Sequence, residues 1–151
     1  MHFFGKSIYY VSPMPKNYLA IDYGERRTGI AFASDSVGIA FPRETIDLKE
    51  KSLWVELERL VAENKITDFV LGMPVHPNNH PDSKQKTVEI FAKELHERFP
   101  QIELHLQDES YSTQEATAMV GAKGAQSKKN KEKIDKAAAT VILQRFLDAF
   151  I

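Results

Sequence analysis

The spacing of hydrophobic residues changes once along this chain, and this change limits the possible folds more than any other feature. Up to about residue 46, short apolar or alternating stretches predict strands at 18–22, at 28–33 and within 37–46. Further on, segments with an apolar residue at every third or fourth position alternate with short apolar runs, which predicts helices and strands in turn. The sequence therefore predicts an α/β fold.

The order of the predicted elements indicates how the sheet is connected. Brief turns between the first three strands favour an antiparallel meander, with the third strand bent near Pro42. Asp47 and Glu50 have the spacing of a capping box, which predicts that a helix starts there. Strands at 69–71 and 102–106 then alternate with helices, and such crossovers join parallel strands. We therefore expect a mixed five-stranded sheet flanked by helices.

Length and composition indicate one ordinary globular domain. The chain has 151 residues, of which 42% are hydrophobic and 27% are charged. It has no cysteine, no signal-peptide pattern and no apolar run of roughly 20 residues, so we expect a cytoplasmic protein. Residues 1–17 contain Pro13 and Pro15 and show no clear periodicity. We expect them to form a poorly ordered N-terminal extension, with Met14 as a candidate start and the domain over 18–151.

Acidic residues lie where the chain leaves a strand or enters a helix. Asp22 closes the first strand, the pair Asp108 and Glu109 closes the last, and Asp135 lies in a helix expected over 132–149. Each also has a structural interpretation, because acids are common in turns, on surfaces and near helix N-termini. Asp135 shares a helix face with apolar residues, so its charge would need an arginine, a backbone cap or a metal as its partner.

Taken together, these acids favour metal chemistry. The carboxyl ends of parallel strands meet at one edge of a sheet, where α/β proteins bind ligands. Carboxylate oxygens suit Mg²⁺ or Mn²⁺, and two such ions can clamp the attacking and leaving oxygens of a phosphodiester. His76 and His80 lack the spacing of zinc ligands and are interpreted as surface histidines.

Overall charge gives little evidence for a nucleic-acid partner, because the net charge is −1 and the pI is about 6.5. One local exception is a lysine-rich stretch ahead of the last helix. Its members are Lys123, Lys128, Lys129, Lys131, Lys133 and Lys136. On charge alone a solvated loop is the favoured interpretation, and a surface that binds phosphates is the alternative.

Four segments, in order along the chain, resemble the motifs of the YqgF/RuvX family. They are YLAIDYGERRTGIA at 18–31, GMP at 72–74, DESYST at 108–113 and IDKAAATVILQ at 134–144. The resemblance runs from residue 18 to residue 149, and it implies a ribonuclease H-like nuclease domain related to Holliday-junction resolvases. It also implies a role in maturing the precursor of 16S ribosomal RNA. By the same resemblance, Asp22, Glu109 and Asp135 are the catalytic, metal-binding acids, with Mg²⁺ or Mn²⁺ as cofactor.

The resemblance also changes the interpretation of the basic residues. A lysine-rich loop that leads into the helix of Asp135 becomes a candidate for phosphate binding, together with two arginines of the first turn. The candidate nucleic-acid-binding residues are Arg26, Arg27, Lys123, Lys128, Lys129 and Lys131. Arg27 could equally pair with a structural carboxylate. Two departures reduce the expected substrate contacts: Ser110 stands where the family usually has arginine, and 76–81 replaces a glycine-rich, acidic loop.

Several functions remain open at this stage. An endonuclease that processes precursor ribosomal RNA is the first, and the alternatives are a junction resolvase acting on branched DNA and a non-catalytic factor that binds nucleic acid. RNA and DNA offer the same phosphodiester to the same metals. Junction resolution asks for a symmetric dimer, so a monomer and a homodimer both remain open. An actin-like or sugar-kinase ATPase is disfavoured because it needs two such domains, and 151 residues supply one.

Overall fold

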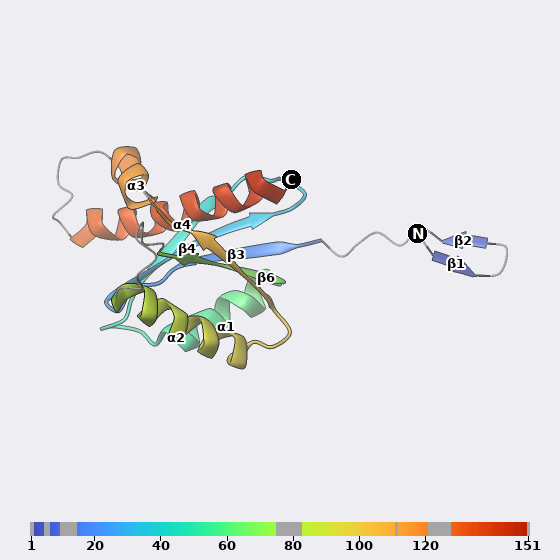
Figure 1. The fold of residues 1–151 in the computed structure, drawn as a ribbon, viewed down its shortest axis with the longest axis horizontal. Helices are drawn as coiled ribbons and strands as arrows, with labels where there is room; N and C mark the ends of the chain where they lie inside the picture. Colours follow the sequence, from blue (N-terminus) through green and yellow to red (C-terminus); the bar gives the residue numbers. More distant parts are fainter. Residues whose placement is uncertain are drawn as a thin grey trace.

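The structure is a computed structural model that describes residues 2–4, 7–9, 15–74, 83–110, 112–120 and 128–150. Its strands are β1 (His2–Phe4), β2 (Ser7–Tyr9), β3 (Asn17–Asp22), β4 (Arg27–Ser34), β5 (Phe41–Asp47), β6 (Asp68–Met73) and β7 (Glu103–Asp108). Its helices are α1 (Leu53–Asn64), α2 (Ser83–Arg98), α3 (Ser112–Val120) and α4 (Lys128–Phe150) (Figure 1).

Five of the strands form one mixed sheet in the order β5-β4-β3-β6-β7. β3, β4 and β5 are antiparallel neighbours, and β6 and β7 run parallel to β3. This confirms the predicted meander followed by parallel strands. The irregularity expected near Pro42 is also present, because Ile30 pairs with Glu44 while Ala31 pairs with Pro42, which shifts the register between β4 and β5.

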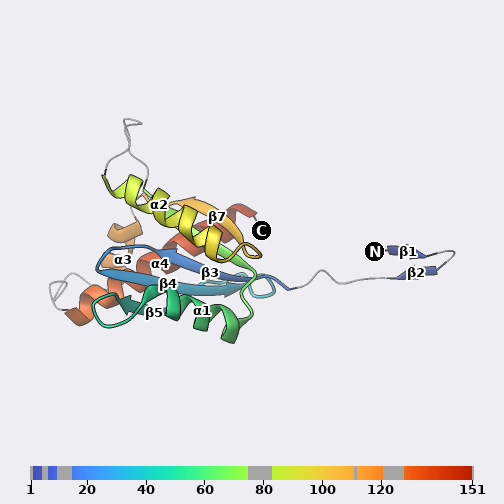
Figure 2. The ribbon, with the colours of Figure 1, turned by 90° about the horizontal axis from the view of Figure 1, so that it is seen from below.

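Helices cover both faces of the sheet (Figures 1 and 2). α1 and α2 pack on one face, where Leu57, Leu60 and Leu95 join Leu19 and Ile21 of β3 in a buried cluster. α4 packs on the other face. The buried cluster between α4 and the sheet includes Tyr18, Ala20, Ala31, Ala33, Val70, Ala139, Ile142, Leu143, Phe146 and Leu147. Since successive residues of a strand point to opposite faces, β3 contributes to both cores.

Small residues let α4 lie very close to the sheet. The face of the sheet beneath α4 offers Ala20, Ala31 and Ala33. At Gly29 of β4 the approach is closest, because a Cβ there would overlap the backbone carbonyl of Asp135. Gly29 is the register partner of Asp22 in β3. The helix turn that carries Asp135 is therefore seated directly over the end of the first core strand.

Two boundaries differ from those predicted. The helix expected at Asp47 begins at Leu53, and Asp47 instead ends β5 and accepts a hydrogen bond from the backbone N–H of Lys49 at 3.0 Å. The last helix begins at Lys128 and not near 132. Lys128, Lys129 and Lys131 are therefore helical, and the prediction that they lie in a loop was wrong.

The first residues form a small element of their own. β1 and β2 pair antiparallel with each other, and within the described residues neither strand joins the five-stranded sheet. β3 begins at Asn17, one residue before the expected start of the core. The division into an extension and a domain stays a prediction, as does the poor order of the extension. A search of the described helices found none long and apolar enough to cross a membrane.

Candidate active site

Two acidic side chains meet at the carboxyl edge of the parallel strands. Asp22 is the last residue of β3, and Glu109 directly follows β7. The backbone N–H of Glu109 donates to the carbonyl of Met73, 3.2 Å away, which ties the end of β7 to the end of β6. The Glu109 side chain is only 8% exposed, so its carboxylate lies inside the protein surface. The sequence correctly placed these two acids at one edge.

The electrostatics of this pair are unusual. Burial raises the pKa of Asp22 well above its usual value, and the charge of Glu109 and a hydrogen bond with it raise the pKa further. Lys84 acts in the opposite direction. Because Asp22 is buried beside a second carboxyl group, its charged form is disfavoured, and a nearby cation would favour it.

A glycine makes room for the second acid. A Cβ built on Gly72 of β6 would lie 2.6 Å from Cδ1 of Ile142 and 2.9 Å from Oε2 of Glu109. Any side chain at position 72 would therefore push the Glu109 carboxylate away from the end of β3. Gly72 was noted in the sequence only as part of a motif, and the structure supplies the physical reason for it.

Sequence reasoning missed a lysine at the centre of this arrangement. Lys84 is the second residue of α2, and its Nζ lies 3.3 Å from Oε1 of Glu109. Its charge lowers the pKa of both Asp22 and Asp135. One signal was available, because a lysine in the first turn of a helix opposes the helix dipole and so calls for a specific partner.

Asp135 completes the acidic edge from the other side of the sheet. It lies two turns into α4, beyond the first turn, so placement near the helix N-terminus does not explain it. Nε of Arg27 donates to its Oδ2 at 2.7 Å, and both side chains are 24% exposed. Burial raises the pKa of Asp135 although Arg27 lowers it. Of the three partners expected for this acid, the structure provides the arginine.

The basic residues proposed to bind nucleic acid fall into different groups. Arg27 holds Asp135, and Nε of Arg26 lies 3.3 Å from Oδ1 of Asp47. Lys128 lies 3.0 Å from Glu50 and 3.3 Å from Asp47, so it joins α4 to the turn after β5. Lys129 and Lys131 are exposed on α4. Lys123, together with His76 and His80, lies outside the described residues.

A second acidic cluster lies at the opposite edge of the sheet. Asp68 begins β6, Glu103 begins β7, and His105 lies two residues further on. Their ligand atoms lie within 4.8 Å of one another, so this group could hold a metal ion. Although burial would raise the pKa of Asp68, hydrogen bonds from Thr67 and His105 and the charge of Lys16 hold it below its usual value.

The two edges of the sheet differ in how nearby groups neutralise the charge of their carboxylates. Nζ of Lys16 lies 3.6 Å from Asp68 and 3.8 Å from Glu103, and Nε2 of His105 lies 2.7 Å from Asp68. The charge of Lys16 and the hydrogen bonds to Asp68 therefore already stabilise Asp68 as a carboxylate. At the carboxyl edge, by contrast, Asp22 faces Glu109, and burial and the charge of Glu109 raise the pKa of Asp22.

Comparisons with known proteins identify the family of this chain. Residues 16–149 match the family model described as "RuvX: Holliday junction resolvase". A protein of Opitutus terrae named "Putative pre-16S rRNA nuclease" is 33% identical over 131 residues, which is 86% of this chain and 90% of that protein. A protein of the same name from Thiobacillus denitrificans is 35% identical over 132 residues, 87% of this chain and 90% of that protein.

The fold also resembles that of a solved structure. Thermus thermophilus RuvC in complex with a Holliday junction substrate superposes with a TM-score of 0.51, covering 89% of this chain and 94% of that one. The sequence identity is 13%, so this likeness concerns the fold alone. It confirms the predicted ribonuclease H-like arrangement of a mixed sheet flanked by helices.

Proposed function

This chain belongs to the RuvX family. We propose that it is a metal-dependent nuclease that hydrolyses phosphodiester bonds in structured nucleic acid, and that its substrate is precursor 16S ribosomal RNA. The observation that carries the proposal is the pair of Asp22 and Glu109, in which burial and the charge of Glu109 hold the pKa of Asp22 well above its usual value. Such a pair stores repulsion that a bound divalent cation relieves. The absence of cysteine fits a cytoplasmic location, which we include in the proposal.

The donor set at this edge fits magnesium or manganese. Asp22 and Glu109 offer carboxylate oxygens, which are the ligands that these hard cations prefer. Asp135 supplies a third carboxylate from α4, seated over Gly29 beside Asp22. When bound, Mg²⁺ or Mn²⁺ supplies Lewis-acid activation of the phosphodiester and of the attacking water.

The protein's own residues set up this chemistry. Arg27 holds one oxygen of Asp135 at 2.7 Å and so fixes the orientation of that carboxylate. Gly72 leaves the space in which Glu109 faces Asp22. Lys84 has a more than half-exposed side chain beside Glu109, so it can turn to a phosphate oxygen of an incoming strand. Lys129 and Lys131 on α4 are proposed to bind phosphates further along the strand, which would add affinity without sequence specificity.

Cleavage of two substrates side by side tests this function. A precursor 16S ribosomal RNA fragment and a four-way DNA junction are each incubated with the protein and Mn²⁺, and products are resolved on denaturing gels. We expect the RNA to be cut, Asp22→Asn to abolish cutting, and Glu103→Gln, a matched change at the opposite edge, to leave it intact. Cutting by Asp22→Asn at the wild-type rate would overturn the assignment.

Junction resolution is the second candidate function. It is favoured by the description of the matching family and by the fold shared with a resolvase bound to a junction. Cutting of the junction and not of the RNA would select it. A homodimer in solution is then required, because two strands must be cut symmetrically. A chain that binds both substrates and cuts neither, with manganese bound, would be the non-catalytic factor.

A further inference from the structure

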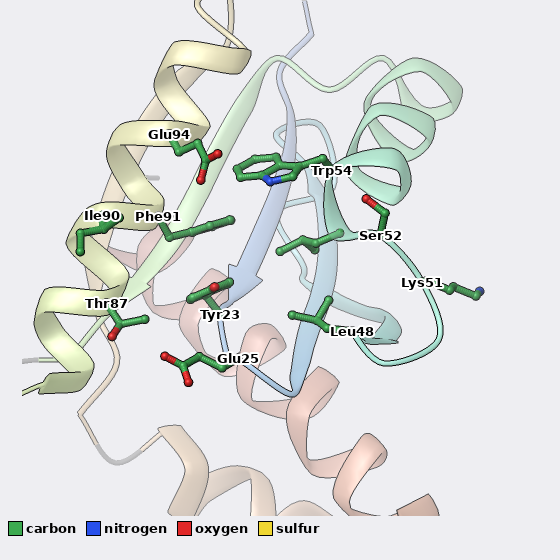
Figure 3. A pocket seen from close by; sticks show the side chains of 11 residues that line it. Tyr23, Glu25, Leu48, Lys51, Ser52, Trp54, Thr87, Ile90, Phe91 and Glu94 are labelled. Atoms are coloured by element: carbon green, nitrogen blue, oxygen red, sulfur yellow. The ribbon is translucent and has the colours of Figure 1, made fainter.

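An open pocket of about 500 Å³ lies beside the proposed active site, between α1, α2 and the turn after β3 (Figure 3). Its volume falls within the range of roughly 300–1,000 Å³ that is usual for small-molecule sites. The pocket begins at Tyr23, which directly follows Asp22. Tyr23 packs on the α1 and α2 side of the sheet, whereas Asp22 ends β3 on the side of α4. An occupant of the pocket would therefore meet the acidic pair around the carboxyl edge of the sheet.

Aromatic rings form the inner surface of the pocket. The rings of Tyr23 and Phe91 are stacked, with centroids 4.1 Å apart and planes 6° apart. The indole of Trp54 stacks on Phe91 from 5.3 Å at 24°. Phe91 is buried and belongs to the core, whereas Tyr23 and Trp54 are half-buried and line the opening. Phe91 lies between the other two rings (Figure 3), and Arg98 lies over Trp54. Tyr23 is therefore the ring that offers a face on which an unpaired base can stack.

The rim of the pocket is acidic. Glu25 and Glu94 both line it, and after burial their charges are what raise the pKa of Tyr23. Arg98 donates to Oε1 of Glu94 at 3.3 Å and places its guanidinium 4.3 Å from the Trp54 ring. Figure 3 shows Glu94 directed toward the indole of Trp54. Ionised carboxylates only accept hydrogen bonds, so Glu25 and Glu94 favour amino groups over phosphate. Lys51 also lines the pocket, but Figure 3 shows it directed away from the rings.

Shared lining residues connect the pocket to a hollow beside the acidic edge. A neighbouring hollow of about 350 Å³ shares Tyr23, Glu25 and Thr87 with it and is also lined by Lys84. Lys84 in turn contacts Glu109. The lining residues therefore lead from the aromatic rings past Lys84 to the proposed metal ligands. Along this line the charge changes from the acidic rim to the positive Lys84. A nucleotide has the same layout, with a flat base at one end and an anionic phosphate at the other.

We propose that this pocket binds one unpaired, amino-bearing nucleobase of the substrate, next to the phosphodiester that is cut. The inference rests on the proposed nuclease function and adds to it a preference within the substrate. Guanine offers a ring N–H and an amino group to the carboxylates, adenine and cytosine offer an amino group, and uracil offers no amino group. Guanine should therefore bind most tightly and uracil most weakly.

The chain contains a single tryptophan, Trp54, so its tryptophan fluorescence comes from a residue that lines this pocket. Guanosine 5′-monophosphate, uridine 5′-monophosphate and inorganic phosphate are titrated into the metal-free protein. We expect saturable quenching by the guanosine nucleotide, binding of the uridine nucleotide about tenfold weaker, and no response to phosphate. Equal responses to both nucleotides, or a response to phosphate that matches them, would overturn the proposal.

Variants separate the stacking from the acidic rim. Tyr23→Leu should weaken guanosine nucleotide binding about tenfold. The double change Glu25→Gln and Glu94→Gln, confined to the rim, should remove the preference for guanine over uracil while leaving binding itself. Val55→Ala is the matched control, because Val55 is exposed on α1 and does not line the pocket. Thermal unfolding of each variant checks the fold, and wild-type affinity in a folded Tyr23→Leu protein would refute the stacking.

The titration needs neither metal nor cleavage, so the two proposals can fail separately. A chain that cuts RNA while Trp54 gives no response to nucleotides would keep the nuclease and lose the pocket. A chain that shows the guanine preference but cuts neither substrate would keep the pocket and lose the nuclease.

Discussion

Replacing Arg27 by methionine tests the seating of Asp135, because it removes the charge that Asp135 faces while keeping an aliphatic stem. The pair spans 2.7 Å, and each side chain is 24% exposed. Breaking a fully buried pair costs about 3–5 kcal/mol, whereas an exposed pair contributes about 0–1 kcal/mol. A pair exposed by one quarter lies between these limits, so we expect Arg27→Met to lower the free energy of unfolding by about 1–3 kcal/mol. For a domain of this size, that corresponds to a melting temperature lower by about 3–10 °C.

The loss should depend on pH in a defined direction. Burial already raises the pKa of Asp135, and removing Arg27 raises it further above the value in the unfolded chain. A group with a raised folded pKa stabilises the fold below its unfolded pKa, and this contribution is lost as the pH rises through the folded pKa. The deficit of Arg27→Met should therefore be larger at pH 7 than near the usual carboxyl pKa of about 4.

Urea unfolding at several pH values measures this deficit. The double variant Arg27→Met with Asp135→Asn should recover part of the loss, because no unpaired charge then remains buried. Arg26→Met is the matched control, since Arg26 is more exposed and pairs with Asp47 at 3.3 Å. A deficit for Arg27→Met below about 0.5 kcal/mol, or one that grows as the pH falls, would refute the reasoning.

Three further outcomes follow from the same edge. Asp22→Asn should raise the free energy of unfolding of the metal-free protein at pH 7 by on the order of 1 kcal/mol, because the amide removes the repulsion with Glu109. Urea unfolding measures this change, and a destabilised variant would contradict it. Gly72→Ala should lower the free energy of unfolding by about 1–3 kcal/mol and weaken manganese binding, because the added methyl group would lie 2.6 Å from Cδ1 of Ile142 and 2.9 Å from Oε2 of Glu109. Thermal unfolding with and without Mn²⁺ measures both effects. A variant that behaves like the wild type in both would contradict the crowding. Mn²⁺ at a hundredfold excess over its Kd should stabilise the wild type by about 2.7 kcal/mol, and a chelator should reverse the gain; equal stabilisation of Asp22→Asn would place the ion elsewhere.

The course of the sheet could be predicted because its signals are local. Leu19 and Ile21 face one core while Tyr18 and Ala20 face the other, and this burial on both sides is what the short apolar run of β3 indicates. The starts of the helices were predicted less accurately. Asp47 has the spacing of a capping residue, but its side chain accepts a backbone N–H in the turn after β5, and Ser52 precedes the helix instead.

The acids could be placed at one edge from the sequence, but their partners could not. That Asp22 and Glu109 meet follows from two parallel strands ending together. The contact of Arg27 with Asp135 spans 108 residues and depends on how closely α4 crosses Gly29, which no local pattern expresses. Lys84 reaches Glu109 from a helix whose preceding loop departs from the family pattern, so the motifs did not point to it. The aromatic pocket likewise combines Tyr23, Trp54 and Phe91 from three separate elements.

Calorimetric titration of Mn²⁺ into the wild type, Asp22→Asn and Glu103→Gln tests the central claim most directly, because both edges of the sheet carry acids that could hold a metal. If the metal centre lies at the carboxyl edge, Asp22→Asn removes the binding isotherm and Glu103→Gln reproduces that of the wild type. The opposite result, with binding lost in Glu103→Gln and kept in Asp22→Asn, would place the metal at the edge of Asp68 and contradict the proposed active site.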